Sequence, residues 1–343
     1  MASQDVVADV CVIIVNYGTA DLALEAAASV LGKAAARVRD IHIVDNDSPH
    51  PSSSPSPGAD DTTDAEVIAR AIAARGWGAR VKLHAESTNH GFGRGNNLVI
   101  AGLAAKASPP DKVFLLNPDA RLDNAVVTIL ATFLDDHPKA GAVGARIEKP
   151  GHGPVTAAFR FPGLISTFSD AVAFGPLSRL CARWQVPLAP DLPTSRVDWV
   201  SGAAVMFRMA ALRDADMFDP EFFLYYEEVD LMRQLARKGW ETWHVAEARV
   251  IHAEGAATGV HNGQSGRRRL PAYWYHSWQY YMRKNHGRPV ALVACLAWAG
   301  GALLNNALSR LRGKGPAAPL HLFSDLWAHA VRPLLGLKAG SDV

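Results

Sequence analysis

Two polar groups in the first third of the sequence carry side chains of the kinds that bind nucleotides and metal ions. Asp45-Asn46-Asp47 and Asn117-Pro118-Asp119 each follow a buried-looking hydrophobic run. A carboxylate in such a place accepts hydrogen bonds from a ribose or a base in nucleotide-binding folds. Asp119 could instead offer an oxygen ligand to Mg²⁺ or Mn²⁺, with Pro118 fixing the turn that presents it. Ordinary turns remain the alternative for both groups, because Asn, Asp and Pro form turns readily.

His252 closes another strand-like run, "VIHAEG". A lone histidine carries little information by itself. It becomes a nitrogen ligand for a metal ion if the fold brings it to Asp119.

Residues 89–97, "NHGFGRGNN", combine glycines with a cation. Gly91, Gly93 and Gly95 permit close backbone approach, and Arg94 with a helix beginning near it would favour an anionic ligand such as a diphosphate. The run comes too late in the chain, and has Asn at position 96, for a nicotinamide-type fingerprint. A plain loop-to-helix turn explains the glycines equally well.

Three acids, Glu227, Glu228 and Asp230, open an amphipathic helical pattern directly behind the aromatic run "FFLYY". Acids in a first helical turn complement the helix dipole, which accounts for one or two of them. A carboxylate beside a partly dry pocket is also a candidate general base.

The elements that must position these groups alternate between strand and helix. Strand-like runs cover residues 10–18, 41–48, 81–87 and 112–116, with helical patterns between them. This alternation predicts a parallel sheet with helices on both faces. Ligands of such sheets bind at the carboxyl ends of the strands, where Asn16-Tyr17-Gly18 and the groups above are found.

Composition excludes some classes of function. The 343 residues carry a net charge of +2, which gives no support for nucleic acid as a partner. The three cysteines are far apart and lack metal-ligand spacing, so we expect reduced thiols in a cytoplasmic protein. The N-terminus lacks the basic region of a signal peptide.

Two segments interrupt the alternation. Residues 48–64 are rich in Pro, Ser and Asp, which predicts a mobile surface loop, either a plain insertion or a lid. Residues 154–191 lose their periodicity, as a variable substrate-facing or membrane-facing segment would, or an irregular packing region.

The C-terminal part places Trp274, Trp278 and Tyr281 at one helical spacing among basic residues. The apolar run that follows, residues 289–304, is shorter than the roughly 20 residues of a spanning helix, and Asn305-Asn306 closes it. This pattern suits a helix on an anionic membrane surface. A helical hairpin packed on the catalytic domain or on a second subunit is the alternative.

The order of motifs along residues 10–255 resembles family 2 of the inverting glycosyltransferases, most closely its rhamnosyltransferase-like bacterial branch. The motifs that carry the resemblance are "VIIVNYG", "VDNDS", "NHGFGRGNN", "LLNPDA", "DWVSGAAVMFR", "FFLYYEEVDLMRQLARKGW" and "VIHAEG". The resemblance implies a GT-A fold, a Rossmann-like α/β architecture with a mixed, mainly parallel sheet, here followed by a C-terminal helical extension.

The resemblance also implies roles for single residues. The donor-binding positions are Asn16, Tyr17, Asp45, Asn46, Gly91, Gly93, Arg94, Asn96, Asn97 and Asn117. Trp199, Ser201 and Gly202 match the acceptor side, and Asp119 with His252 match the metal ligands. Glu228 matches the catalytic base. Glu227-Glu228 replaces the family's usual Glu-Asp, so Glu227 and Asp230 stay open as alternatives.

The expected protein is therefore a metal-dependent inverting glycosyltransferase, with residues 1–260 as catalytic domain and residues 261–343 as a helical extension. The favoured donor is dTDP-L-rhamnose and the acceptor a bacterial surface glycan or lipid-linked sugar, with Mg²⁺ or Mn²⁺ as cofactor. We expect it at the inner face of the cell membrane, with a homo-oligomer left open. Another donor such as a UDP-sugar, or a non-catalytic scaffold, remains the alternative. A nucleotidyltransferase would need a Gly-rich loop after the first strand, which "VNYGTADLA" lacks.

Overall fold

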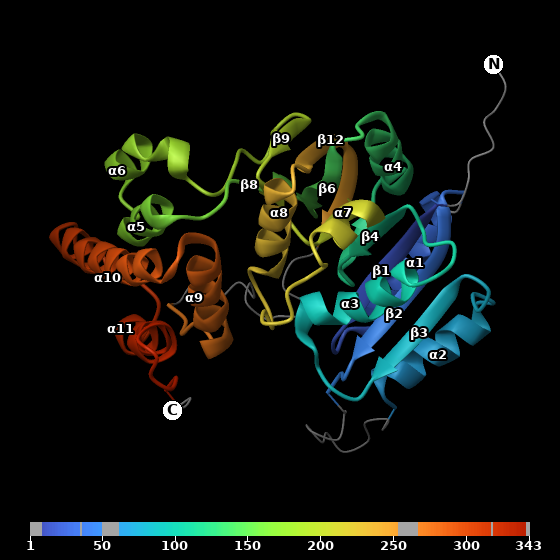
Figure 1. Ribbon diagram of the computed structural model, residues 1–343, viewed down its shortest axis with the longest axis horizontal. Helices are drawn as coiled ribbons and strands as arrows, with labels where there is room; N and C mark the ends of the chain where they lie inside the picture. The colour runs from blue at the N-terminus through green and yellow to red at the C-terminus, as the bar shows by residue number, and fades with distance from the viewer. Residues whose placement is uncertain (1–8, 35, 50–61, 253–266, 317, 341–343) are drawn as a thin grey trace.

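The computed structural model describes residues 9–34, 36–49, 62–252, 267–316 and 318–340. Its central feature is a twisted sheet with helices on both faces, beside which the C-terminal helices form a separate layer (Figure 1).

The described part of the chain forms a ten-stranded sheet, whose continuous path has the order β3-β2-β1-β4-β11-β6-β12-β5. The strands of this path are β1 (Val10–Asn16), β2 (Val38–Asn46), β3 (Val81–Glu86), β4 (Lys112–Leu116), β5 (Ala120–Leu122), β6 (Ala140–Lys149), β11 (Ala204–Arg208) and β12 (Glu241–His252). Two short strands pair outside it, β7 (Gly153–Val155) on β6 and β9 (Ser195–Val197) on β12.

Strand direction decides which polar groups meet. β1 pairs in parallel with β2 and with β4. β11 is antiparallel to both β4 and β6, and β12 is parallel to β6, so β12 runs in the same direction as β4. The carboxyl ends of β1, β2, β4 and β12 therefore share one edge, and the sheet is mixed but mostly parallel, as predicted.

Both faces of the sheet are covered, which explains the continuous hydrophobic runs of β1 and β4. One face packs on helices α1 (Ala20–Ala34), α2 (Asp64–Ala74) and α4 (Val126–Asp136). The other packs on α3 (Gly91–Ala104), α7 (Met209–Asp214) and α8 (Glu227–Arg237).

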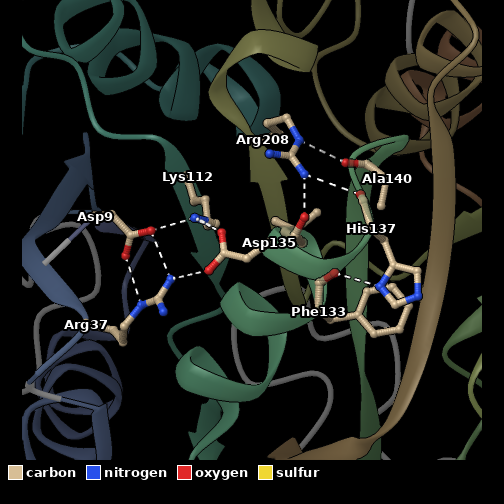
Figure 2. A network of polar contacts seen from close by, with 9 residues as sticks. Asp9, Arg37, Lys112, Phe133, Asp135, His137, Ala140 and Arg208 are labelled. Atoms are coloured by element: carbon tan, nitrogen blue, oxygen red, sulfur yellow. Dashed lines mark hydrogen bonds and ion pairs between the residues drawn. The ribbon is translucent and has the colours of Figure 1, made fainter. Parts of the chain in front are cut away.

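An ion network ties together the amino end of the sheet (Figure 2). Arg37, just before β2, pairs with Asp9 at 2.9 Å and with Asp135 of α4 at 2.8 Å. Lys112 at the start of β4 pairs with the same two carboxylates, at 2.7 Å from Asp135, and its side chain is only 3 % exposed. Each cation thus bridges two acids, so this buried charge is fully compensated.

The C-terminal helices pack on the catalytic part of the chain. A third hydrophobic cluster joins Phe222 and Val229 to residues of α9 (Ala272–His286), α10 (Arg288–Leu311) and α11 (Leu322–Leu326). Lys284 of α9 bonds to Asp219 and to Asp230, each at 2.6 Å. The structure thus shows these helices packed on the catalytic part of the chain, and contact with a membrane surface stays a prediction.

Helix α10 is longer than predicted. The apolar run ends at Asn305-Asn306, but the helix runs on to Leu311, and Asn305 Nδ2 donates to the Val172 carbonyl of α5 (Leu164–Val172) at 2.7 Å. Gly301 allows this close crossing, since a Cβ there would lie 2.7 Å from Ala171 Cβ. By length and composition α10 could cross a membrane, a criterion that core helices of soluble proteins also meet.

Other local expectations can be compared with the structure. Helix α3 begins at Gly91 and not near Arg94. Residues 154–191 contain short elements: β8 (Ala158–Phe159), α5, α6 (Gly175–Leu180) and a 3-10 turn, Ala182–Trp184. Of the predicted surface loop, residues 50–61 lie outside the described part of the chain.

Candidate active site

The ends of β1 and β2 meet through the side chain of Asn16, which is fully buried. Its Nδ2 lies 3.0 Å from Asp45 Oδ1, 3.1 Å from Ser48 Oγ and 2.8 Å from Asp64 Oδ2. Burial raises the pKa of Asp45, against the hydrogen bonds from Ser48 and Asn16. Tyr17, next in sequence, is 39 % exposed beside this group. Two carboxylates around one amide form a polar site that could accept hydrogen bonds from a nucleoside.

The glycine run approaches the protein's own chain. Gly91 has φ +73°, and a Cβ there would lie 1.8 Å from the Phe223 carbonyl oxygen. Gly93 faces Phe218, and Gly95 faces Val15 of β1. These glycines therefore let the first turn of α3 pack between β1 and residues 218–223.

The amides and the cation near this run also hold local structure. Asn46 Nδ2 donates to the Gly91 carbonyl oxygen at 3.1 Å, and Asn46 Oδ1 accepts from the backbone N–H of His90 at 3.0 Å. Arg94 Nε donates to the His90 carbonyl oxygen at 2.9 Å. Asn96 donates to the backbone of Phe92, and Asn97 to that of Phe218. These side chains of the predicted donor segment thus hold the backbone around the start of α3.

Asn117-Pro118-Asp119 forms a turn that also presents a carboxylate. The backbone N–H of Ala120 donates to the Asn117 carbonyl oxygen at 3.1 Å, which closes the turn. Asn117 N–H donates to the Ala203 carbonyl oxygen at 2.9 Å and continues the pairing of β4 with β11. Asp119 is 7 % exposed. The structure therefore shows the turn, and metal binding by Asp119 stays a prediction.

The predicted convergence of Asp119 and His252 is observed. Antiparallel pairing places His252 opposite Ala120, and His252 Nε2 lies 2.9 Å from Asp119 Oδ1. One carboxylate and one imidazole are a suitable donor set for Mn²⁺, and two protein ligands leave room for phosphate oxygens and water.

A second group of metal-binding side chains lies at the other end of the sheet. The ligand atoms of Cys11, Asp40 and His42 lie within 4.8 Å of one another. Asp40 pairs with Lys82 at 2.9 Å, and burial raises the pKa of the Cys11 thiol to about 11. This group is five residues from Asn16 along β1, on the order of 15 Å away. It belongs to the core of the fold and not to the edge where Asp119 lies.

The acids of α8 follow a strained backbone. Tyr225 and Tyr226 both have φ +69°, in the left-handed region that non-glycine residues rarely adopt. Glu227 is 3 % exposed, and burial together with the charge of Glu228 raises its pKa well above the ordinary range. Burial also raises the pKa of Glu228. Within the described residues, one oxygen of each carboxylate has no hydrogen-bond partner.

The three acids differ in what they face. Glu228 lines a cavity of about 440 Å³ together with Trp199. Asp230 is 1 % exposed and bonded to Lys284 at 2.6 Å and to Asn285 at 2.8 Å, so it anchors α9. Glu227 packs against Gly93 of α3, where an added Cβ would lie 3.4 Å from Glu227 Cβ. Of the three acids, Glu228 is therefore the one that lines the cavity, and Asp230 is committed to an ion pair.

Two of the three predicted acceptor residues, Trp199 and Gly202, lie near Glu228. Trp199 opens β10 (Trp199–Val200), stacks on Phe159 at 4.0 Å, and donates from Nε1 to the Arg160 carbonyl oxygen at 2.9 Å. A Cβ at Gly202 would lie 3.8 Å from Glu228 Oε1. Ser201 Oγ accepts from the backbone N–H of Ala203 at 3.3 Å.

A family model described as "Glycosyltransferase like family 2" matches residues 8–270. The chain belongs to this family.

Curated relatives of this glycosyltransferase carry rhamnosyltransferase names. It is 31 % identical over 188 residues to an N-acetylglucosaminyl-diphospho-decaprenol L-rhamnosyltransferase of Mycobacterium tuberculosis (strain ATCC 25618 / H37Rv), a match of 52 % of this chain and 61 % of the relative. It is 22 % identical over 165 residues to the rhamnosyltransferase WbbL of Escherichia coli (strain K12), covering 48 % and 61 %. The match thus spans about three-fifths of each relative's length.

Solved structures support the fold. A mannosyltransferase from Pyrobaculum calidifontis, in complex with GDP-Man and Mn²⁺, superposes with a TM-score of 0.52 at 13 % identity, over 96 % of this chain and 82 % of that one. GalNAc-T7 with UDP, GalNAc and Mn²⁺ gives 0.51 at 13 % identity, over 71 % and 43 %. The predicted GT-A-like fold and glycosyltransferase class are confirmed.

Sequence reasoning missed two parts of the glycosyltransferase site. Asp64 reaches Asn16 from the start of α2, and its only sequence signal was its place in an N-terminal helical turn after a Pro/Ser-rich segment. The left-handed Tyr225 and Tyr226 gave no signal, because neither Gly nor Asn marks the turn.

Proposed function

We propose that this glycosyltransferase transfers L-rhamnose from dTDP-L-rhamnose to a hydroxyl of a lipid-linked or cell-surface glycan, with inversion at the anomeric carbon. The observation that carries the proposal links the turn of Asp119 to the segment beside Glu228. Asn117 N–H, at the start of that turn, donates to the Ala203 carbonyl oxygen at 2.9 Å, and a Cβ at the preceding Gly202 would lie 3.8 Å from Glu228 Oε1. Asp119 converges with His252, and Glu228 lines the cavity. The rhamnosyltransferase names of the relatives support the donor sugar.

On the donor side, Asp119 and His252 would hold Mg²⁺ or Mn²⁺. Such an ion supplies positive charge to the departing diphosphate. Asp45 and Asn16 would contact the nucleoside beside Tyr17. Arg94, in the first turn of α3, would add positive charge on the same side, where the helix N-terminus also favours an anion.

On the acceptor side, Glu228 would take the proton of the attacking hydroxyl. The new bond joins that oxygen to the anomeric carbon as the bond from the carbon to the diphosphate oxygen breaks. Glu227 lies next to it and is the more deeply buried, so we expect Glu227 to keep a proton while Glu228 ionises. One displacement inverts the configuration without a covalent intermediate on the protein.

The proposed location of the protein in the cell follows from the proposed lipid-linked acceptor. Residues 1–260 would act on the cytoplasmic side, with α10 of the 261–343 extension against the inner membrane surface. Five large apolar side chains of this helix are exposed: Val293, Leu296, Leu303, Leu304 and Leu311. A basic residue, Arg310, lies in its last turn, which suits an anionic lipid surface.

The test is transfer with chosen donors. The purified protein with Mn²⁺ receives dTDP-L-rhamnose, UDP-glucose or UDP-N-acetylglucosamine, each with a synthetic N-acetylglucosaminyl-diphospho-lipid, and products are followed by mass spectrometry. We expect rhamnosyl transfer to exceed the other two at least ~10-fold, a ratio that small differences in pocket contacts supply. Faster transfer from a UDP-sugar would overturn the donor assignment, and inversion is checked by the anomeric coupling of the product.

A further inference from the structure

A cavity of about 440 Å³ lies between the catalytic base candidate and the C-terminal helices. Its volume is within the roughly 300–1,000 Å³ of small-molecule sites. The side chains that give its wall a distinct chemistry are Trp199, Trp274, Trp278, Trp298, Asp170 and Glu228.

The indole rings are fixed before any ligand arrives. Trp298 of α10 contacts Trp274 and Trp278 of α9 in edge-on geometry, with ring centroids 5.3 and 5.0 Å apart. Trp199 is held by Phe159 and by a backbone carbonyl. A preformed wall of this kind costs little ordering entropy on binding.

Two carboxylates border this aromatic cavity. Glu228 belongs to α8 and Asp170 to α5, and both line the same cavity. Burial raises the pKa of Asp170, and no cation or hydrogen bond opposes that effect. Asp170 nevertheless remains open to solvent and is available to a ligand.

The lining favours one chemistry of occupant. A diphosphate would be repelled by the two acids, and a hydrocarbon chain would leave them without hydrogen-bond donors. A sugar ring presents C–H groups on its faces, which pack on indole rings, and hydroxyl donors around its rim.

We propose that this cavity binds the acceptor sugar as a neutral ring, with Asp170 accepting a hydrogen bond from one hydroxyl while another faces Glu228. The proposal rests on the proposed glycosyl transfer and names where its acceptor lies. Because three of the tryptophans belong to α9 and α10, the C-terminal extension completes the acceptor site and helps to select the acceptor.

The experiment measures sugar binding without chemistry. Methyl glycosides of N-acetylglucosamine, glucose and galactose are titrated into the full chain and followed by saturation-transfer NMR, with farnesyl phosphate as a lipid probe. We expect at least one glycoside to bind saturably, and farnesyl phosphate not to displace it. Asp170→Ala should weaken that binding about 10-fold, the typical loss of a hydrogen bond to a charged group.

The matched control is Asp191→Ala, an exposed acid outside the cavity, which should bind the glycoside like the wild type. Unchanged affinity in Asp170→Ala, binding of none of the glycosides, or displacement by farnesyl phosphate would overturn the proposal. Binding of dTDP with Mn²⁺ is measured in parallel and should be equal in both variants. If the wild type binds a glycoside but no nucleotide, the proposed function fails while the sugar site stands.

Discussion

At the amino end of the central sheet, Arg37 and Lys112 each bridge the carboxylates of Asp9 and Asp135, so every charge there has a partner of opposite sign (Figure 2). At the carboxyl end of the same strands the acids gather around amides and around one another. Asp45 and Asp64 share the amide of Asn16.

Glu227 and Glu228, at the start of α8, form a second acidic group at the carboxyl end. Glu227 is buried and its neighbour Glu228 is partly buried, the pKa of each is raised, and no cation lowers either pKa. One end of the sheet thus stabilises the fold, and at the other the pKa values of Asp45, Glu227 and Glu228 are raised with no cation to lower them, which leaves these acids available to a ligand. Perturbed acids of this kind mark functional sites.

The largest expected effect comes from removing the base at the carboxyl end. Glu228→Gln should lower turnover about 100-fold or more, because proton removal by a placed base is worth that much, with nucleotide affinity unchanged. Steady-state rates and calorimetric nucleotide binding check this. Glu227→Gln is the matched control, expected to keep most activity because a neutral amide replaces a protonated acid. A Glu228→Gln rate near that of the wild type would contradict the assignment.

The second-largest effect is expected from removing a cation at the amino end of the sheet. Lys112→Met removes one bridging cation and should lower the free energy of unfolding by about 2–3 kcal/mol, less than the roughly 3–5 for a fully buried pair. The expected loss is smaller than for a fully buried pair because the side chain of Asp135, one of the two acids that Lys112 bridges, is 44 % exposed. Urea unfolding measures it, with exposed Lys139→Met as control within about 0.5 kcal/mol. A large loss of turnover in folded Lys112→Met would contradict the claim that the amino end of the sheet serves stability and not catalysis.

The smallest effect is a pH dependence. The folded pKa of Glu227 lies above its unfolded value, so the protonated acid stabilises the fold at low pH and that stability is lost as pH rises through the folded pKa. Unfolding free energies measured from pH 5 to 9 should therefore fall less in Glu227→Gln than in the wild type. Wild-type turnover should rise with pH as Glu228 ionises. Identical stability slopes in the two proteins would argue against a buried acid.

Much of the fold could be predicted, because hydrophobic periodicity is a local property. β-branched runs gave the strands, and parallel strands necessarily bring their carboxyl ends to one edge. That rule placed Asn16, Asp45 and Asp119 near one another. The convergence of Asp119 with His252 was predicted through the family resemblance, and the antiparallel register of β5 and β12 produces it.

What could not be predicted depends on distant contacts. Asp230 looked like one more acid of a first helical turn, and its partner Lys284 lies 54 residues further on. The glycines at 91, 93 and 95 looked like a ligand cradle, since their close neighbours, Phe223, Phe218 and Val15, are remote in sequence. Asn305 looked like the polar end of an apolar run, and its acceptor, the Val172 carbonyl, belongs to another helix.

The central claim is that the carboxyl end of the sheet binds a nucleotide diphosphate through a metal ion held by Asp119 and His252. Isothermal titration with dTDP, UDP and GDP, each with Mn²⁺ and again with EDTA, tests it on the wild type, on Asp119→Asn and on the control Asp123→Asn, whose acid pairs with Arg249. We predict tight dTDP binding that requires Mn²⁺ in the wild type and the control, and that Asp119→Asn loses. Equal affinity with Mn²⁺ in Asp119→Asn and the wild type, or no nucleotide binding at all, would contradict the account.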